Sequence, residues 1–100
     1  MNITKNKQNQ ITTVSLEGRI DTLSAPELEG YLLPLLRKDN PVIVVDLAKV
    51  DYISSAGLRT FLIARKLVET VEGKLILQNM NQRVKQVFDI TGFTPMFEVR

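Results

Sequence analysis

The sequence predicts a single α/β domain over residues 1–100, with a mixed sheet of four to five strands, an N-terminal antiparallel hairpin and three to four packed helices. Its length suits one domain, which can bury a core without disulfides or metals. Segments with alternating or continuous apolar residues are interleaved with segments of helical period. Their order, β-β-α-β-α-β-α-β, predicts parallel strands joined by right-handed helical crossovers.

The N-terminal region has the pattern of a hairpin. From position 12 to 17 apolar and polar side chains alternate, which is typical of a half-buried strand whose inward residues are Thr12, Val14 and Leu16. A second short strand pattern precedes it. Residues 2–7 and 11–17 are therefore expected to pair through a turn at 7–10.

The first helix is expected to start at Ser24-Ala25-Pro26-Glu27, which has the pattern of a capping box with proline in the first turn. Pro34 cannot donate a hydrogen bond to the carbonyl of Gly30, so a kink or an early helix end is expected there. The inward stripe consists of Leu28, Leu32, Leu35 and Leu36.

The remaining elements follow from periodicity and from helix-stop signals. Residues 41–47 predict a strand buried on both faces, and residues 74–78 a shorter one. A helix is expected from Ser55 to about Thr70, and Gly73 is expected to close it. Its expected core side chains are Leu58, Phe61, Leu62 and Val68.

A third helix is expected over residues 79–91, where Gly92 and Pro95 stop it. It packs through Val84, Val87 and Phe88. Residues 96–99 predict an edge strand whose brevity favours a monomer.

Composition excludes several classes of function. The chain has no cysteine and no histidine, so thiolate, imidazole and ordinary zinc chemistry are not available. Its five glycines form neither a P-loop nor a dinucleotide-binding pattern. We therefore expect no enzyme activity, no catalytic residue and no cofactor.

Charge and hydropathy exclude further partners. The formal net charge is +2 and the 13 basic residues are scattered, so nucleic acid is not expected as a partner. Residues 1–7 lack the apolar segment of a secretion signal, and the apolar run Val42 to Val45 is far too short to span a membrane. A soluble cytoplasmic chain without membrane insertion is expected.

Three aspartates could meet at the carboxyl edge of the sheet, where α/β proteins bind ligands: Asp21, Asp46 and Asp51. Such a cluster would suit a metal ion or a phospho-accepting aspartate. Aspartate also caps turns routinely at loop entrances. We favour capping and expect no metal.

The segment from Asp51 to Arg59 is the most informative part of the chain. It joins a buried strand, after a five-residue link, to an apolar-periodic helix, and its two serines, Ser54 and Ser55, can cap that helix. Next to them, the small residues Ala56 and Gly57 add little bulk to the first turn of the helix and leave a serine hydroxyl accessible. Glycine inside a helix costs up to about 1 kcal/mol relative to alanine. That cost indicates either the close approach of a strand or the docking of a partner.

Three stretches, LEGRID (16–21), VVDL (44–47) and DYISSAGL (51–58), resemble the anti-sigma factor antagonists of the STAS domain family. The resemblance continues through residues 73–75 and 84–93 and so covers nearly the whole chain in order. It implies a STAS-like fold and an indirect role in regulating transcription.

The resemblance also implies partner switching. The unmodified antagonist would bind an anti-sigma factor that is also a serine kinase, would let go when the kinase phosphorylates it, and would be reset by a metal-dependent serine phosphatase. The matching acceptor is Ser55, and Asp21 matches an acidic residue near it. The expected partner-binding residues are Asp21, Thr22, Ser54, Ser55, Ala56, Gly57, Leu58 and Arg59.

Two departures from the family and three alternatives remain. The family often has Asp-Ser-Ser-Gly or Asp-Ser-Thr-Gly, whereas this chain has Ser54-Ser55-Ala56-Gly57. Ser54 replaces the acidic neighbour, which makes it a rival phosphate acceptor, and Ala56 replaces the second hydroxyl. The chain could instead be an unphosphorylated STAS subunit of a lipid or anion transport complex. It could also be a receiver domain phosphorylated on Asp46, or it could bind a small anion or nucleotide at the helix N-terminus.

Overall fold

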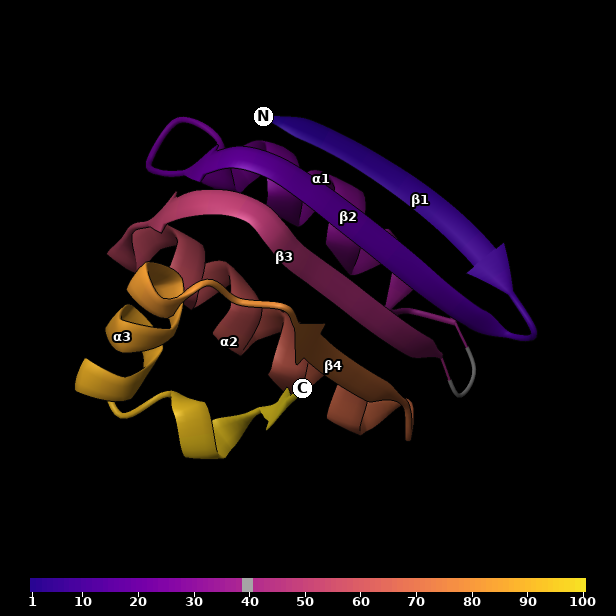
Figure 1. Ribbon diagram of the computed structural model, residues 1–100. Helices are drawn as coiled ribbons and strands as arrows, with labels where there is room; N and C mark the ends of the chain where they lie inside the picture. The colour runs from indigo at the N-terminus through magenta and orange to yellow at the C-terminus, as the bar shows by residue number, and fades with distance from the viewer. Residues whose placement is uncertain (39–40) are drawn as a thin grey trace.

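Five strands lie in sequence order across one mixed sheet in the computed structural model, which describes residues 1–38 and 41–100 (Figure 1). The strands β1 and β2 are antiparallel, and every later neighbour is parallel. The predicted single α/β domain with an N-terminal hairpin is confirmed. The elements are β1 Asn2–Gln8, β2 Ile11–Ile20, α1 Ala25–Leu35, β3 Val42–Ile53, α2 Ser55–Thr70, β4 Lys74–Gln78, α3 Gln82–Ile90, the 3₁₀ turn η1 Thr94–Met96 and β5 Glu98–Val99.

The hairpin is closed by two residues, Asn9 and Gln10, with φ values of 52° and 68°. Gln8 pairs with Ile11, so the loop is as short as hairpins allow. Two consecutive residues with positive φ match the right-handed twist of the flanking strands. The turn thus pairs β1 with one edge of β2, and the other edge of β2 pairs with β3.

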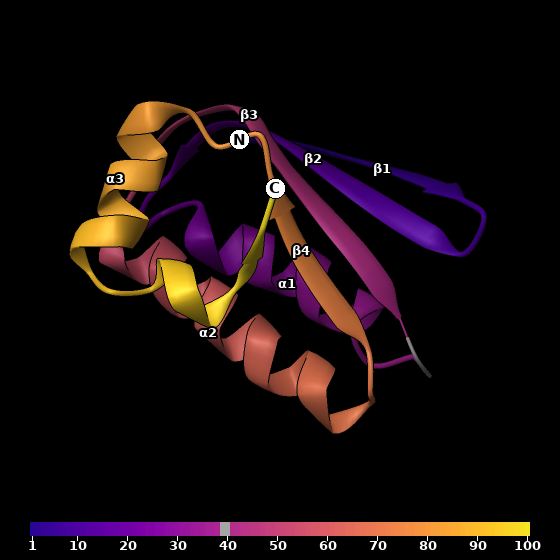
Figure 2. The same cartoon turned by 60° about the horizontal axis from the view of Figure 1, so that its bottom comes forward.

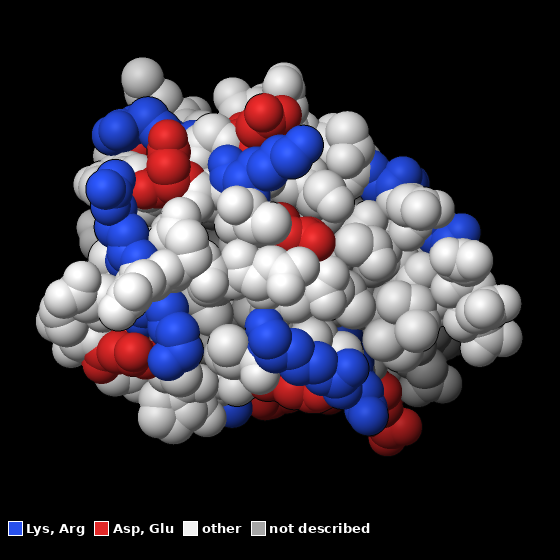
Figure 3. All heavy atoms as spheres, in the orientation of Figure 1, with Lys and Arg blue, Asp and Glu red and all other residues white. Residues whose placement is uncertain are grey.

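Helices α1 and α2 cover one face of the sheet, and α3 packs against β3 and, through Phe88, against Phe61 of α2 (Figures 1 and 2). One hydrophobic core joins all three helices to the sheet, with the rings of Phe61 and Phe88 6.2 Å apart at its centre. The opposite face carries polar β2 side chains such as Ser15 and Glu17. On the face drawn in Figure 3, basic and acidic side chains are interspersed.

Strand β3 is longer than the sequence pattern predicts. It runs to Ile53, so the five-residue link expected after residue 47 is itself strand. The pairing with β2 shifts register twice, between Ser15 and Glu17 and between Gly18 and Arg19, and continues to the last residues of both strands. Val50 and Ile53 lie in the core within this part of the strand. The consequence is that β2 and β3 end side by side.

Helix α1 begins differently from the prediction and ends as predicted. Ser24 lies at the N-cap position, but its side chain does not cap the first turn, so the capping box with Glu27 is wrong. The hydroxyl of Ser24 instead bonds within the preceding turn. The helix ends at Leu35, directly after Pro34, which confirms the early end.

The end of α2 also differs from the prediction. The left-handed residue is Glu72, with φ of 56°, and Gly73 donates its N–H to the carbonyl of Val68 at 2.9 Å. A Cβ on Gly73 would lie 2.6 Å from the carbonyl oxygen of Pro41, so this glycine permits close packing. Leu62, predicted in the core, is half-buried, whereas Ala64 is fully buried there.

Helix α3 starts at Gln82, three residues later than predicted, since Asn79 has a φ of 62° and Asn81 is the N-cap. The Asn81 side chain accepts a hydrogen bond from the N–H of Val84 at 2.8 Å. Gly92, at φ 77°, follows the helix as predicted. Across residues 1–38 and 41–100, every helix is too short or too polar to cross a membrane.

Candidate functional site at the carboxyl edge of β2 and β3

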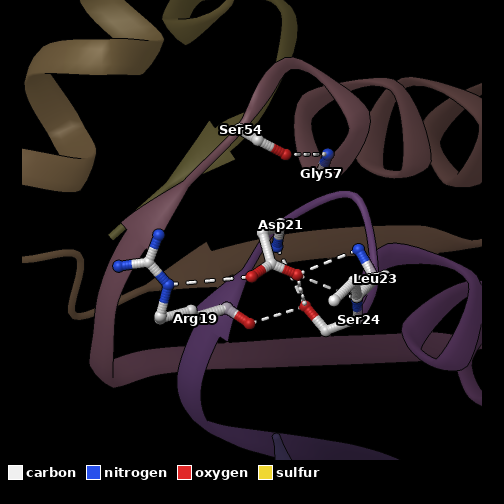
Figure 4. A network of polar contacts seen from close by, with 6 residues as sticks. All are labelled: Arg19, Asp21, Leu23, Ser24, Ser54 and Gly57. Atoms are coloured by element: carbon white, nitrogen blue, oxygen red, sulfur yellow. Dashed lines mark hydrogen bonds and ion pairs between the residues drawn. The ribbon is translucent and has the colours of Figure 1, made fainter.

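The site lies where two parallel strands end together. Ile20 and Ile53, the last residues of β2 and β3, are paired neighbours. The N–H of Ser54 donates to the carbonyl of Ile20 at 2.8 Å. The turn that starts at Asp21 and the first turn of α2 therefore leave the sheet next to each other (Figure 4).

Ser54 is the N-cap of α2. Its backbone is extended, at φ −96° and ψ 174°, and its hydroxyl accepts a hydrogen bond from the N–H of Gly57 at 3.3 Å. Its carbonyl accepts the first helical bond, from the N–H of Leu58 at 3.0 Å. The side chain of Ser54 is thus used to satisfy a free amide of the helix terminus.

Ser55 is the first residue of α2 and is exposed to solvent. In the part of the chain that the structure describes, its hydroxyl makes no hydrogen bond, unlike the hydroxyls of Ser24 and Ser54. It also lies among N–H groups at the positive end of the helix dipole. The side chain can therefore reach another protein without breaking any internal contact.

Gly57 explains how α2 comes so close to the sheet. A Cβ at this position would lie 2.6 Å from Cγ2 of Ile20 and 2.8 Å from Cγ1 of Ile53. Of the two reasons that the sequence allowed for this glycine, the close approach of strands is the one that the structure shows. Gly57 and Leu58 are buried, so they hold the first turn of α2 against the sheet and do not offer a surface to a partner.

The other predicted binding residues are accessible to different extents. Thr22 and Arg59 are exposed, and Ala56 is half-buried next to Ser55. All three lie on the two segments that leave β2 and β3 together. The exposed part of the predicted set therefore belongs to one edge of the domain.

Asp21 organises the turn between β2 and α1. Its Oδ1 accepts hydrogen bonds from the N–H groups of Leu23 and Ser24, both at 3.0 Å, and lies 3.2 Å from the hydroxyl oxygen of Ser24. Arg19 contributes an ion pair at 3.7 Å. The backbone N–H of Ser24 is the main cause that lowers the pKa of Asp21 below its ordinary value.

The three aspartates considered for a metal or phosphate site do not converge. Asp46 lies in the middle of β3, where it accepts hydrogen bonds from the Ala48 amide and from the side chains of Gln78 and Asn79. Asp51 is exposed on the same strand. Over the described residues no three acidic side chains group together. The capping interpretation is confirmed for Asp21, whereas Asp46 lies inside β3 and not at a loop entrance. The receiver interpretation therefore has no acceptor at the strand end.

Three residues at this edge were missed by the sequence analysis. The guanidinium carbon of Arg19 lies 4.4 Å from the ring centroid of Tyr52, because the two residues are paired across β2 and β3. Leu23 is 88% exposed. Arg19 and Tyr52 are paired only because β3 continues beyond residue 47, where the sequence pattern predicts a link, so no local signal indicates the pair.

Comparison with known proteins gives one consistent family. The STAS domain profile matches residues 2–100. The protein BtrV of Bordetella bronchiseptica is 36% identical over 99 residues, which are 99% of this chain and 85% of the relative. The anti-sigma-B factor antagonist of Bacillus subtilis is 35% identical over 95 residues, which are 95% of this chain and 85% of the relative.

Solved structures share the fold at lower identity. The anti-sigma factor antagonist SpoIIAA in its unphosphorylated form matches with a TM-score of 0.81 and 19% identity, over 99% of this chain and 88% of that one. Its phosphorylated form matches with a TM-score of 0.74 and 18% identity, over 99% and 91%. A sulfate transporter family protein of Wolinella succinogenes matches with a TM-score of 0.79 and 17% identity, over 92% and 77%.

Proposed function

This chain belongs to the STAS domain family, and from that membership we propose that it is an anti-sigma factor antagonist switched by phosphorylation of Ser55. In its unmodified form it binds an anti-sigma factor that is also a serine kinase, and this binding frees a sigma factor. The observation that carries the proposal is the exposed Ser55 hydroxyl at the start of α2, which has no internal partner in the described structure.

The geometry favours Ser55 over Ser54 as the acceptor. The oxygen of Ser54 already accepts a hydrogen bond from the Gly57 amide, so a kinase would have to break the helix cap to use it. Loss of a serine cap costs about 1 kcal/mol. Ser55 has no such contact to lose and is the more exposed of the two.

The switch needs little change within the domain. A phosphoserine carries about −1.5 to −2 charges. At the N-terminus of α2 those charges meet free N–H groups and the positive end of the dipole, so the fold should tolerate them. The existence of both forms of SpoIIAA on this fold supports that expectation.

The partner surface responds in the opposite way. A protein that has covered a neutral hydroxyl must instead bury an unpaired charge, which costs several kcal/mol. A loss of about 4 kcal/mol weakens binding roughly a thousandfold. Phosphorylation would therefore release the anti-sigma factor without unfolding either protein.

The proposal includes a second enzyme and a cellular setting. As the family resemblance implies, a metal-dependent serine phosphatase would remove the phosphate and restore binding. The protein would act in the cytoplasm, as a monomeric regulator, with neither nucleic acid nor membrane as a direct partner. The partner-binding residues are Thr22, Ser54, Ser55, Ala56 and Arg59, with Gly57 and Leu58 buried beneath them. Asp21, predicted among them, holds the neighbouring turn through its carboxylate.

Phosphorylation by the purified anti-sigma kinase, followed by mapping of the modified peptide by mass spectrometry, tests the assignment. We expect one phosphate, on Ser55, in the wild-type protein and in Ser54→Ala, and none in Ser55→Ala. Phosphate on Ser54 in the wild type would contradict the assignment, and so would a Ser55→Ala variant that is still modified.

The structural likeness to a sulfate transporter family protein keeps one other function open. As a STAS subunit of a lipid or anion transport complex, the chain would use the same edge without phosphorylation. Stable co-purification with a nucleotide-binding transport subunit, and no affinity for an anti-sigma factor, would favour this second function.

A further inference from the structure

Leu23 is the most exposed large hydrophobic residue in the described structure, with 88% of its surface open to solvent. The others of this kind are Ile11, Tyr52, Ile90 and Met96. A single exposed leucine is ordinary on a protein surface, so its exposure alone indicates no function. Its backbone and its neighbours make this one different.

The backbone on both sides of Leu23 is held by hydrogen bonds. The N–H groups of Leu23 and Ser24 donate to the same carboxylate oxygen of Asp21, each at 3.0 Å (Figure 4). The hydroxyl of Ser24 donates to the carbonyl of Arg19 at 2.6 Å and accepts from the N–H of Asp21 at 2.9 Å. The turn is therefore ordered while its apolar side chain remains in water. Because the backbone of the turn is already ordered, a partner that covers Leu23 needs to order only its side chain.

The turn lies at the same edge of the sheet as Ser55. Ile20 and Ile53 are paired, and the chain enters the turn directly after the first and α2 directly after the second. The ring of Tyr52, 39% exposed, lies on this edge under the guanidinium of Arg19. Tyrosine and arginine are enriched among the residues that dominate binding energy at protein interfaces. The edge thus combines an apolar side chain, an aromatic ring and a neutral hydroxyl.

Resting on the proposed function, we propose that Leu23 is the apolar anchor with which this chain docks on its anti-sigma factor. Asp21 then acts as a positioning residue, because its carboxylate is engaged in holding the turn. The partner would offer an apolar recess for the leucine beside the surface that covers Ser55. This differs from the expectation that Asp21 contacts the partner directly.

Titration calorimetry tests the anchor. The candidate partners are the anti-sigma factors with a serine-kinase domain that the same genome encodes, and each is purified and titrated with this chain. For a factor that binds the wild type, Leu23→Ala should weaken binding about tenfold to a hundredfold, the factor that corresponds to burying a leucine side chain. Leu23→Met should retain most of the affinity. Ile90→Ala is the matched control, since Ile90 is 76% exposed on α3, and should bind like the wild type.

Substitution of Asp21 separates positioning from direct contact. Asp21→Asn keeps an oxygen that can accept from Leu23 and Ser24, and should bind nearly as well as the wild type. Asp21→Ala loses the acceptor, should weaken binding as Leu23→Ala does, and should add little to that variant in the double substitution. Amide NMR signals of Leu23 and Ser24 should report a loosened turn in Asp21→Ala only.

The outcomes distinguish the two proposals. If the wild type binds none of the factors, the proposed function fails and the anchor with it. If the wild type and Leu23→Ala bind one factor equally well, the anchor alone is wrong. Equal losses for Asp21→Asn and Asp21→Ala would show that the partner contacts the charge of Asp21 itself.

Discussion

The N–H of Ser54 donates to the carbonyl of Ile20 at 2.8 Å and joins the start of α2 to the last residue of β2. This bond continues the pairing of β2 and β3 by one residue beyond the sheet. As a result, two loops that are distant in sequence form one edge, with Ser55 on one side and the Asp21 turn on the other.

Gly57→Ala should destabilise the domain by about 1–3 kcal/mol, the usual cost of overpacking a core. The added methyl group would lie under 3 Å from side chains of Ile20 and Ile53. Because both are strand-end residues, the first turn of α2 would have to move away from the sheet. Urea unfolding followed by circular dichroism measures the loss.

Gly30→Ala is the matched control for that substitution. Gly30 lies inside α1, and a Cβ there would meet no other atom within 4 Å. Alanine should stabilise the domain by about 0.4–1 kcal/mol, because it has the higher helix propensity and a less flexible unfolded chain. A loss of stability at Gly30, or no loss at Gly57, would refute the packing argument.

Ser54→Ala and Ser55→Ala should differ in stability although the serines are adjacent. Removing the Ser54 hydroxyl leaves the Gly57 amide without its acceptor and should cost about 1 kcal/mol. Removing the Ser55 hydroxyl breaks no hydrogen bond in the described structure and should change stability by less than about 0.5 kcal/mol. Unfolding midpoints of the two variants provide the comparison, and equal losses would contradict the different roles assigned to these serines.

Asp21 should contribute to stability in a pH-dependent way. Its pKa in the folded protein is lowered from 3.8, mainly by the N–H of Ser24, so the unfolded chain binds the proton more readily. The contribution is therefore present above about pH 4 and is lost as the pH falls through the folded pKa. The difference in unfolding midpoint between the wild type and Asp21→Asn should shrink over that acidic range. A difference that stays constant from pH 6 to pH 2.5 would contradict this.

Much of the fold follows from local sequence patterns. The alternation in β2, the apolar run in β3 and the leucine stripe of α1 each arise from burial on one or two faces, which periodicity reports directly. Pro34 and Gly92 act at single positions through backbone geometry, and both act near a helix end as expected. These features need no knowledge of the rest of the chain.

The errors arise where a distant segment decides the local structure. The second half of β3 is strand because β2 pairs with it through two register shifts, although its own residues do not alternate regularly. Ser24 does not cap α1 because Asp21 and Arg19 provide better partners for its hydroxyl. Gly73 is required by Pro41 rather than by the helix that precedes it.

Only the contiguous part of the candidate site could be predicted from the sequence. Ser55 and its neighbours follow one another in the chain, so a motif could indicate them. Leu23 and the pair of Arg19 and Tyr52 join the site only through the pairing of β2 with β3. Residues brought together by strand register have no signature in a single sequence.

The affinity of the anti-sigma factor for Ser55→Ala and Ser55→Asp, measured by calorimetry, tests the central proposal most directly. If a neutral side chain at the start of α2 permits docking and a charged one prevents it, Ser55→Ala should bind like the unmodified protein. Ser55→Asp, and the protein phosphorylated on Ser55, should then bind hundreds to about a thousand times more weakly. Equal affinities for the alanine and aspartate variants would contradict the proposal.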